Sequence, residues 1–322
     1  MKKNKIIKPI TEVKAEDENL RLFFLAAARL CSLAIRHAPG PPPLRPPSAM
    51  TAAELKSVIR KKARSLGAIL VGFANLARYR RYYPQAEKIY HPDAVWPEAK
   101  SVIVLGLPLP LPIVETTPSI NYQELYNSSN VWLDQAAYRL SLEITALGHP
   151  SVSLPRDGYA DLKHLIKRAS SSFSHVVAGR LAGLGTIGWN HNLLTPQHGS
   201  RVRLNSVLTT AELTADPLIK KDLCLHCRAC QDLCPAGALG GDPAEPFAEL
   251  DHDKCTRRHQ FLKKAGCWPC GSCTKVCPVG ADREAYRRLG VQRYYREQAG
   301  QSDETIAAWN HVRRFGSERN VR

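Results

Sequence analysis

The sequence predicts an α+β protein in which an α/β-type sandwich domain precedes a smaller cysteine-rich domain. Between residues 50 and 215, short apolar runs of strand length alternate with segments of helical periodicity, as in layered structures of helices and sheet. Nine of the ten cysteines lie between Cys224 and Cys277, which sets residues 216–282 apart. A chain of 322 residues is long enough for more than one domain.

Residues 1–49 are predicted to lie outside the folded part of the chain. Their Pro-rich end favours polyproline II conformation, which packs into neither helix nor sheet. Met50 follows, and then Thr51 with Glu54 three residues later, a capping box that begins a helix. We therefore expect the first domain to begin at Met50, with the preceding segment either a disordered leader or a start assigned too far upstream. Cys31, in this segment, is expected to be incidental.

Two helices and three strands are predicted within residues 50–215. Both helices show apolar residues at helical spacing and stop at a glycine, Gly67 or Gly148, which suits a helix C-terminus. The strands are apolar runs too short for helices. In chain order the expected elements are a helix over 51–66, a strand over 68–73, a strand over 101–106, a helix over 130–147 and a strand over 151–154. Residues 283–322 are expected to form a basic helical tail, with a helix over 284–297.

The chain has a formal net charge of +16. This excess fits a polyanionic partner such as RNA, or an acidic protein. Lys and Arg are nevertheless spread along most of the chain, as general solubility alone would require. The best apolar run, residues 20–35, contains Arg21 and Arg29 and is too short to span a membrane. With no export signal and with cysteines at metal-binding spacing, a reducing, cytoplasmic location is expected.

The cysteines form two copies of the pattern Cys-x2-Cys-x2-Cys-x3-Cys-Pro. The first copy consists of Cys224, Cys227, Cys230 and Cys234, and the second of Cys267, Cys270, Cys273 and Cys277. Three closely spaced thiolates can wrap one face of a cubane cluster, and the fourth, after a longer step, leads the chain to a neighbouring cluster. Zinc ligands are typically arranged as two separated pairs. The spacing therefore predicts two [4Fe–4S] clusters.

Crossed ligation predicts which cysteines share a cluster. The first cluster is expected on Cys224, Cys227, Cys230 and Cys277. Cys234, Cys270 and Cys273 are expected on the second cluster. Its fourth ligand is either Cys267, by simple ferredoxin spacing, or Cys255, and the spacing leaves both open.

A second motif lies between the predicted sandwich and the cysteines. It reads Ala182-Gly183-Leu184-Gly185-Thr186-Ile187-Gly188-Trp189-Asn190, followed by Leu193-Leu194-Thr195-Pro196. Together with the run over residues 97–104 and the second cysteine run, this segment resembles the epoxyqueuosine reductase family, which is distantly related to reductive dehalogenases. The resemblance covers roughly residues 50–282 and is most specific in its last hundred.

The resemblance implies a corrinoid-reductase-like sandwich domain, in which electrons pass through two [4Fe–4S] clusters to a cobalamin. It favours Cys255 as the eighth cluster ligand. It also implies a low-potential electron donor of the ferredoxin or flavodoxin type and, as in the enzyme for which the family is named, tRNA as a partner. Gly183, Gly185 and Gly188 would let the backbone approach the cofactor, although such glycines also serve tight turns.

The acid chemistry of the family is altered in this chain. The family's general-acid aspartate matches a position near Ala169, and no Asp or Glu lies between Lys163 and Gly183. His175 is the best remaining proton donor, and its alternative role is that of a packing histidine. We therefore expect an iron–sulfur oxidoreductase with an unknown substrate. The alternatives are a non-catalytic electron-transfer protein that reduces a partner's cofactor, or a tRNA queuosine-modification reductase with a relocated general acid.

Several arginines are weaker candidates for anion binding. Arg201 and Arg203 could neutralise a phosphate or a cofactor tail, but their alternation with apolar residues also describes a half-exposed strand. The arginines of the tail could hold tRNA or lie on a solvated helix face. They are Arg287, Arg288, Arg293 and Arg296.

Overall fold

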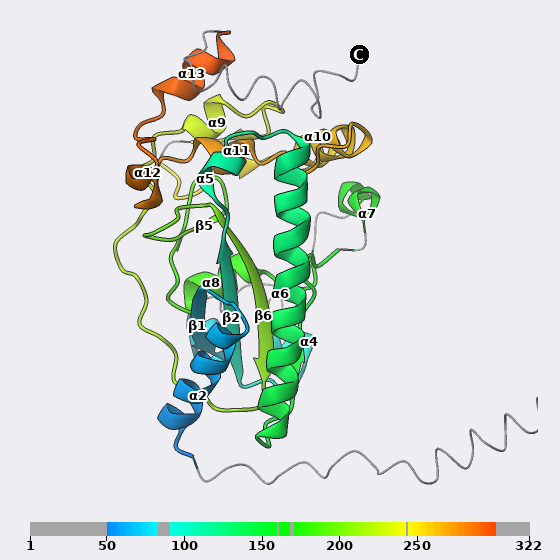
Figure 1. Cartoon of the computed structure of the whole chain (residues 1–322), viewed down its shortest axis with the longest axis vertical. Coiled ribbons are helices and arrows are strands. Elements are labelled where there is room, and N and C mark those ends of the chain that lie inside the picture. The colour runs from blue at the N-terminus through cyan, green and yellow to red at the C-terminus, as the bar shows by residue number, and fades with distance from the viewer. Residues whose placement is uncertain (1–49, 83–90, 160, 168–170, 243, 301–322) are drawn as a thin grey trace, which may run out of the picture. The chain divides into compact units, whose positions relative to one another are not determined.

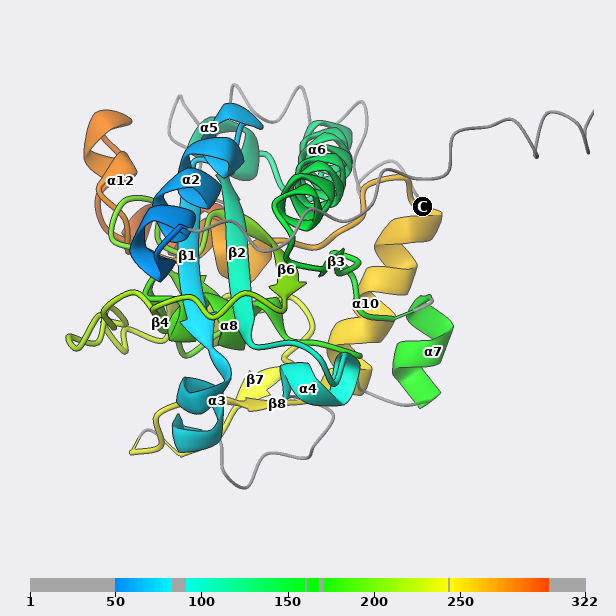
Figure 2. The same ribbon diagram turned by 90° about the horizontal axis from the view of Figure 1, so that it is seen from below.

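A four-stranded antiparallel sheet in the order β1-β2-β6-β3 forms the centre of the first part of the protein (Figure 1 and Figure 2). The strands are β1 (Leu70–Asn75), β2 (Ser101–Pro108), β3 (Ser151–Ser153) and β6 (Val202–Thr209). This computed structural model describes residues 50–82, 91–159, 161–167, 171–242 and 244–300, all within one unit. The predictions made for residues 1–49, Ala169 and residues 301–322 lie outside the described residues.

Helices cover both faces of the sheet (Figure 2). On one face lie α2 (Ala52–Ser65) and the long α6 (Ile120–Ala146), and on the other lies α8 (His175–Leu181). Because β2 is covered on both sides, seven consecutive residues from Ser101 are buried, which explains its continuous apolar run. The layered helix-and-sheet architecture predicted from the alternating pattern is confirmed.

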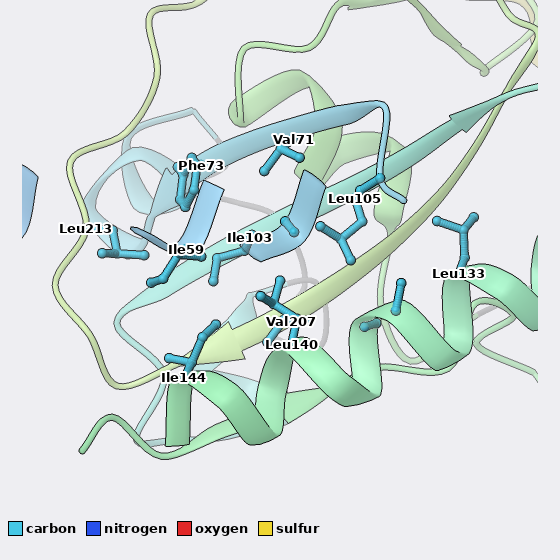
Figure 3. Packing of buried hydrophobic residues seen from close by; sticks show 14 of the residues in the cluster. Ile59, Val71, Phe73, Ile103, Leu105, Leu133, Leu140, Ile144, Val207 and Leu213 are labelled. Atoms are coloured by element: carbon cyan, nitrogen blue, oxygen red, sulfur yellow. The ribbon is translucent and has the colours of Figure 1, made fainter. Parts of the chain in front are cut away.

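The larger hydrophobic core lies between the sheet and the pair α2 and α6 (Figure 3). Ile59 of α2, Ile103 of β2 and Leu140 of α6 meet there, and each is 0% exposed. Val102 and Val104 of β2 point to the opposite face and join a second core beneath α8. Each such side chain contributes about 1.5–3 kcal/mol when fully buried.

The first helix begins and ends as predicted. The Thr51 hydroxyl accepts a hydrogen bond from the Glu54 backbone N–H, and the Glu54 carboxylate accepts one from the Thr51 N–H. After the helix, Gly67 has a φ of +96°, a conformation that favours glycine.

Two helices differ from the sequence prediction. The long helix α6 was expected from residue 130, but it begins at Ile120, because the Ser119 hydroxyl caps it by accepting a hydrogen bond from the Tyr122 N–H. The single tail helix expected over 284–297 is instead two short helices, α12 (Asp282–Ala285) and α13 (Gln292–Gln298). Between them Arg287 and Gly290 have positive φ values of 52° and 74°, which an α-helix does not accommodate.

The cysteine-rich part consists of short elements. The helices are α9 (Ala229–Asp232), α10 (His252–Lys264) and α11 (Ser272–Val276), and β7 (Leu239–Gly240) pairs with β8 (Glu249–Leu250). The remaining elements are α3 (Leu76–Tyr82), α4 (Pro92–Val95), α5 (Leu111–Val114), α7 (Leu162–Lys167), β4 (Thr186–Ile187) and β5 (Leu193–Leu194). In the described part of the chain, every helix is too short or too polar to cross a membrane.

Candidate cluster sites and the adjoining cavity

Four cysteines predicted for one cluster line a single small cavity. They are Cys224, Cys227, Cys230 and Cys277. Cys230 belongs to α9, and Cys277 immediately follows α11, so two segments far apart in sequence supply the group, which we call the first quartet. Burial, and then the neighbouring thiols Cys277, Cys227 and Cys224, raises the pKa of the Cys230 thiol to about 12. Burial and mutual repulsion thus disfavour free thiolates in this quartet, and a bound metal cluster would supply the positive charge that stabilises them.

A second group of four cysteines lines a larger cavity of about 360 Å³. This second quartet consists of Cys234, Cys255, Cys270 and Cys273. Burial, and then proximity to Cys270 and Cys234, raises the pKa of the Cys255 thiol to about 11. Cys255 lies in α10 and reaches the cavity from that helix.

Cys267, the competing candidate for the second cluster, is placed differently. Its side chain is fully buried, and its N–H donates to the Leu262 carbonyl just after α10. It is not among the residues that line either quartet's cavity. The described structure thus brings Cys255, rather than Cys267, together with Cys234, Cys270 and Cys273.

Hydrogen-bond donors point at several of these sulfur atoms. The Trp189 N–H lies 3.4 Å from Cys224 Sγ, and the Ala238 N–H lies 3.4 Å from Cys234 Sγ. Asn192 Nδ2 lies 3.7 Å from Cys273 Sγ. Such donors stabilise thiolates and raise the reduction potential of a bound iron–sulfur cluster. The donor chemistry of both quartets therefore fits cubane clusters.

The three glycines of the upstream motif pack against the chain itself. A Cβ atom on Gly183 would meet the Pro217 carbonyl oxygen, and one on Gly185 or Gly188 would meet Leu194. The space in front of these glycines is thus filled by protein. This close packing fixes the position of the turn that follows the glycines. In that turn, Trp189 contacts the first quartet and Asn192 contacts the second.

His175 is held by two hydrogen bonds and is 9% exposed. Its Nε2 lies 3.0 Å from the Pro155 carbonyl oxygen, which can only accept, so Nε2 carries the proton. Its Nδ1 then accepts from the Ser206 hydroxyl at 2.9 Å. Burial lowers the pKa of His175, so the ring favours its neutral form. His175 lines a smaller cavity of about 230 Å³, but its only proton is already bonded to the backbone.

Three residues from separate segments form a polar cluster in the larger cavity. The Arg203 guanidinium, from β6, lies over the ring of Tyr126, with 4.3 Å from Cζ to the ring centroid. Arg203 Nη2 donates to the Tyr126 hydroxyl at 3.2 Å, and that hydroxyl donates to Asp157 Oδ1 at 3.3 Å. Asn130 Oδ1 accepts from Arg203 Nε at 2.9 Å. Burial, only partly opposed by Arg203, raises the pKa of Tyr126, so its hydroxyl stays protonated and donates to Asp157.

Sequence reasoning identified Arg203 as a candidate for anion binding but missed Tyr126. A usable signal was present, because Tyr122, Tyr126 and Asn130 recur every four residues and so share one face of α6. Tyr122 lies against Gly271 in the second cysteine run. This stripe of α6 therefore faces the second quartet.

The tail arginines divide into two kinds. Arg288 Nε lies 3.2 Å from Glu115 Oε2 and Arg293 Nη1 lies 3.8 Å from Glu115 Oε1, so both turn inward. Arg287 and Arg296 are exposed. The tail thus offers only part of the basic surface expected for tRNA.

A family model described as a 4Fe-4S dicluster domain matches residues 223–281, the segment that contains both quartets. Fold and sites together define a 4Fe–4S dicluster protein in which a helix-covered sheet precedes the cluster domain in the sequence. The chain is similar to an epoxyqueuosine reductase of Synechococcus sp. (strain RCC307), with 45% identity over 24% of this chain and 23% of the relative. It is also similar to a tetrachloroethene reductive dehalogenase of Desulfitobacterium hafniense, with 25% identity over 58% of this chain and 38% of the relative.

The fold agrees with these sequence comparisons. A solved reductive dehalogenase, whose study concerns B12-dependent dehalogenation, superimposes with a TM-score of 0.50 at 20% identity over 86% of this chain and 38% of that one. The chain is thus epoxyqueuosine reductase-like in sequence and related to the reductive dehalogenases, as predicted. It spans less than half the length of these curated relatives.

Proposed function

We propose that this protein is an iron–sulfur oxidoreductase that passes electrons through two [4Fe–4S] clusters to a substrate in the cavity beside the second quartet. The observation that carries the proposal is the sorting of eight cysteines into two groups of four, each around its own cavity. The first cluster is assigned to Cys224, Cys227, Cys230 and Cys277. The second is assigned to Cys234, Cys255, Cys270 and Cys273.

The exposure of the two quartets supports a direction for electron flow. Cys227 of the first quartet is exposed, whereas all four cysteines of the second quartet are partly covered. A low-potential electron donor protein would therefore deliver electrons at the first cluster. The second quartet would hold the cluster that supplies electrons at the cavity lined by Tyr126 and Arg203.

The polar cluster supplies the proton chemistry of the proposed reaction. A two-electron reduction would take one electron from each cluster and two protons, the first from the Tyr126 hydroxyl and the second from solvent. Arg203 would stabilise the negative charge that develops on the substrate and on the Tyr126 oxygen. Solvent would then reprotonate Tyr126, and the electron donor would restore both clusters.

The corrinoid implied by the resemblance does not fit the described cavities. When bound, such a group supplies a low-valent cobalt as reductant. The cavities of about 360 and 230 Å³ are at or below the lower end of the 300–1,000 Å³ range typical of drug-sized ligands. A corrinoid with its side chains and nucleotide tail is larger than these cavities. The space beside the motif glycines is occupied by other residues of the chain. The proposed reaction therefore involves no cobalt.

A non-catalytic electron-transfer protein is the second candidate. The observation in its favour is that His175, the acid predicted from the sequence, already donates its proton to the Pro155 carbonyl. The cavity beside the second quartet, lined by Tyr126 and Arg203, favours the oxidoreductase, since a carrier needs no substrate cavity beside its cluster. Reduction of a tRNA base remains a prediction of the resemblance.

Anaerobic reconstitution with iron and sulfide tests the proposal. Two cubanes predict about eight irons per chain and two electron paramagnetic resonance signals after reduction. About four irons would contradict the assignment of one quartet. Titration with cobalamin, followed by its visible spectrum, tests whether the protein binds a corrinoid. No spectral change is expected, and a stoichiometric change would overturn the corrinoid-free proposal.

A further inference from the structure

Two arginines converge on the main-chain carbonyl of Cys277. Arg201, immediately before β6, donates to this oxygen from Nη1 at 3.1 Å, and Arg283 of α12 donates from Nε at 2.8 Å. Both side chains are 0% exposed. A charged guanidinium is costly to bury unless an opposite charge lies nearby, so each needs a counter-charge.

The counter-charge of Arg201 is a carboxylate within the described protein. Asp282 accepts from Arg201 Nε at 3.0 Å and from Nη2 at 2.6 Å, a two-pronged ion pair. The positive charge of Arg201 is therefore matched without any bound group.

Arg283 differs, because its hydrogen bonds reach only uncharged oxygens. The acceptors are the carbonyls of Cys277, Lys275 and Arg288 and the hydroxyl of Tyr294. Among the hydrogen bonds and ion pairs recorded for the described residues, none joins Arg283 to a carboxylate. The Tyr294 hydroxyl in turn donates a hydrogen bond to Glu115 at 2.9 Å. Glu115, however, also pairs with two other arginines. The positive charge of Arg283 is thus only indirectly balanced.

Cys277 itself connects Arg283 to a source of the missing negative charge. Cys277 belongs to the first quartet, and a cubane held by four thiolates is an anion. We propose that Arg283 is a positioning residue whose guanidinium is the buried counter-charge of the first cluster and raises its reduction potential. This inference rests on the proposed function, since it requires the first quartet to hold a cluster.

The sign of the effect follows from electrostatics. Reduction adds negative charge to the cluster, so a nearby fixed cation favours the reduced state and raises the potential. Glu115 is joined to Cys277 by three successive hydrogen bonds, through Tyr294 and Arg283, and its negative charge opposes that cation. Removing the charge of Arg283 and removing the charge of Glu115 must therefore shift the potential in opposite directions. A purely structural role would not produce opposite shifts.

Redox titration of the reconstituted full chain, followed by electron paramagnetic resonance, measures these shifts. Arg283→Gln is expected to lower the equilibrium constant for reduction of the first cluster about tenfold, a negative shift of about 59 mV for one electron. Glu115→Gln is expected to shift the same midpoint in the positive direction. The second cluster is the internal control, and its midpoint should stay unchanged. A Cys227→Ala variant identifies the signal of the first cluster by removing it.

Arg283→Lys keeps the charge while losing the fork geometry, and it should restore most of the wild-type midpoint. If Arg283→Gln retains its iron with an unmoved midpoint, the inference is overturned. If that variant fails to hold iron, Glu115→Gln decides, and an unmoved midpoint there overturns the inference equally. Failure of the wild-type chain to bind about eight irons would instead contradict the proposed function. Iron content therefore distinguishes failure of the proposed function from failure of this inference.

Discussion

The guanidinium of Arg203 lies over the ring of Tyr126, with its Cζ 4.3 Å from the ring centroid, and its Nη2 donates to the hydroxyl of the same tyrosine at 3.2 Å. Arg203 therefore contacts both the ring and the hydroxyl group of Tyr126. Arg203 comes from β6 and Tyr126 from α6, so this contact joins the sheet to its covering helix next to the second quartet.

Tyr126→Phe tests the strength of that contact. Loss of the hydroxyl removes one hydrogen bond from Arg203 and one to Asp157, so we expect the free energy of unfolding to fall by about 0.5–1.5 kcal/mol. Urea unfolding of the reconstituted protein measures the change. Tyr138→Phe, on the same helix but 58% exposed, is the matched control and should have no measurable effect. Equal effects of the two substitutions would contradict the described hydrogen bonds.

Cys255→Ala and Cys267→Ala distinguish the two candidates for the eighth ligand. Because Cys255 shares the cavity of the second quartet, its replacement should leave about four irons per chain and only the signal of the first cluster. Cys267→Ala should retain about eight irons. Iron analysis and electron paramagnetic resonance provide the measurement, and the reverse result would reassign the ligand to Cys267.

Asp216 ties the first helix and strand to the segment that enters the cysteine-rich part. Its carboxylate accepts from Arg60 at 2.8 and 2.9 Å and from the Phe73 N–H at 3.1 Å, and it pairs with Lys56 at 2.7 Å. Asp216→Asn should cost about 1–3 kcal/mol, because it leaves partly buried cations underpaired.

Denaturant unfolding with unchanged iron content provides the measurement for Asp216→Asn. Glu212→Gln is its control, since the Glu212–Lys100 pair is exposed and should contribute nothing measurable. A midpoint shift in the control as large as that of Asp216→Asn would refute the special role of Asp216.

His175 predicts a dependence of stability on pH. Burial, as the largest cause, lowers the pKa of His175 below its ordinary 6.5, and Arg203 acts in the same direction, against the Pro155 carbonyl, Asp157 and Asp134. Between the lowered pKa of the folded state and 6.5, the unfolded chain binds a proton at His175 that the folded chain does not bind. The contribution of His175 is therefore fully present above pH 6.5 and is lost as the pH falls toward the folded pKa.

His175→Gln should flatten this part of the pH dependence. Urea midpoints of both proteins, measured between pH 7.5 and the onset of cluster loss in acid, should converge as the pH falls. Parallel curves would show that His175 does not titrate in this way. Comparison within the pair cancels the acid lability that both proteins share.

Local sequence signals predicted the first helix, three strands of the sheet and most of α6, but not α8 or α10. Thr51 and Glu54 predicted the start of α2 because a capping box needs only neighbouring residues. The apolar run at Ser101 predicted β2 because both faces of that strand are buried. The start of α6 was missed, since Tyr122 and its neighbours are polar or aromatic and show the helix only where they pack against the cysteine-rich part. Positive φ values at Arg287 and Gly290 broke the predicted tail helix, and only the glycine is a signal that the sequence shows.

By itself the sequence determined the chemistry of the protein, because cysteine spacing within a few residues is a local property and two Cys-x2-Cys-x2-Cys-x3-Cys-Pro runs suit cubane clusters. Only the tertiary structure decided which side chains meet. Cys255 rather than Cys267 lies with the second quartet because α10 carries it to that cavity. Arg201 reaches the Cys277 carbonyl, and so meets Arg283 there, because β6 and the second cysteine run, which are distant in sequence, pack side by side. Such long-range contacts depend on the packing of the whole fold, which no spacing of residues records.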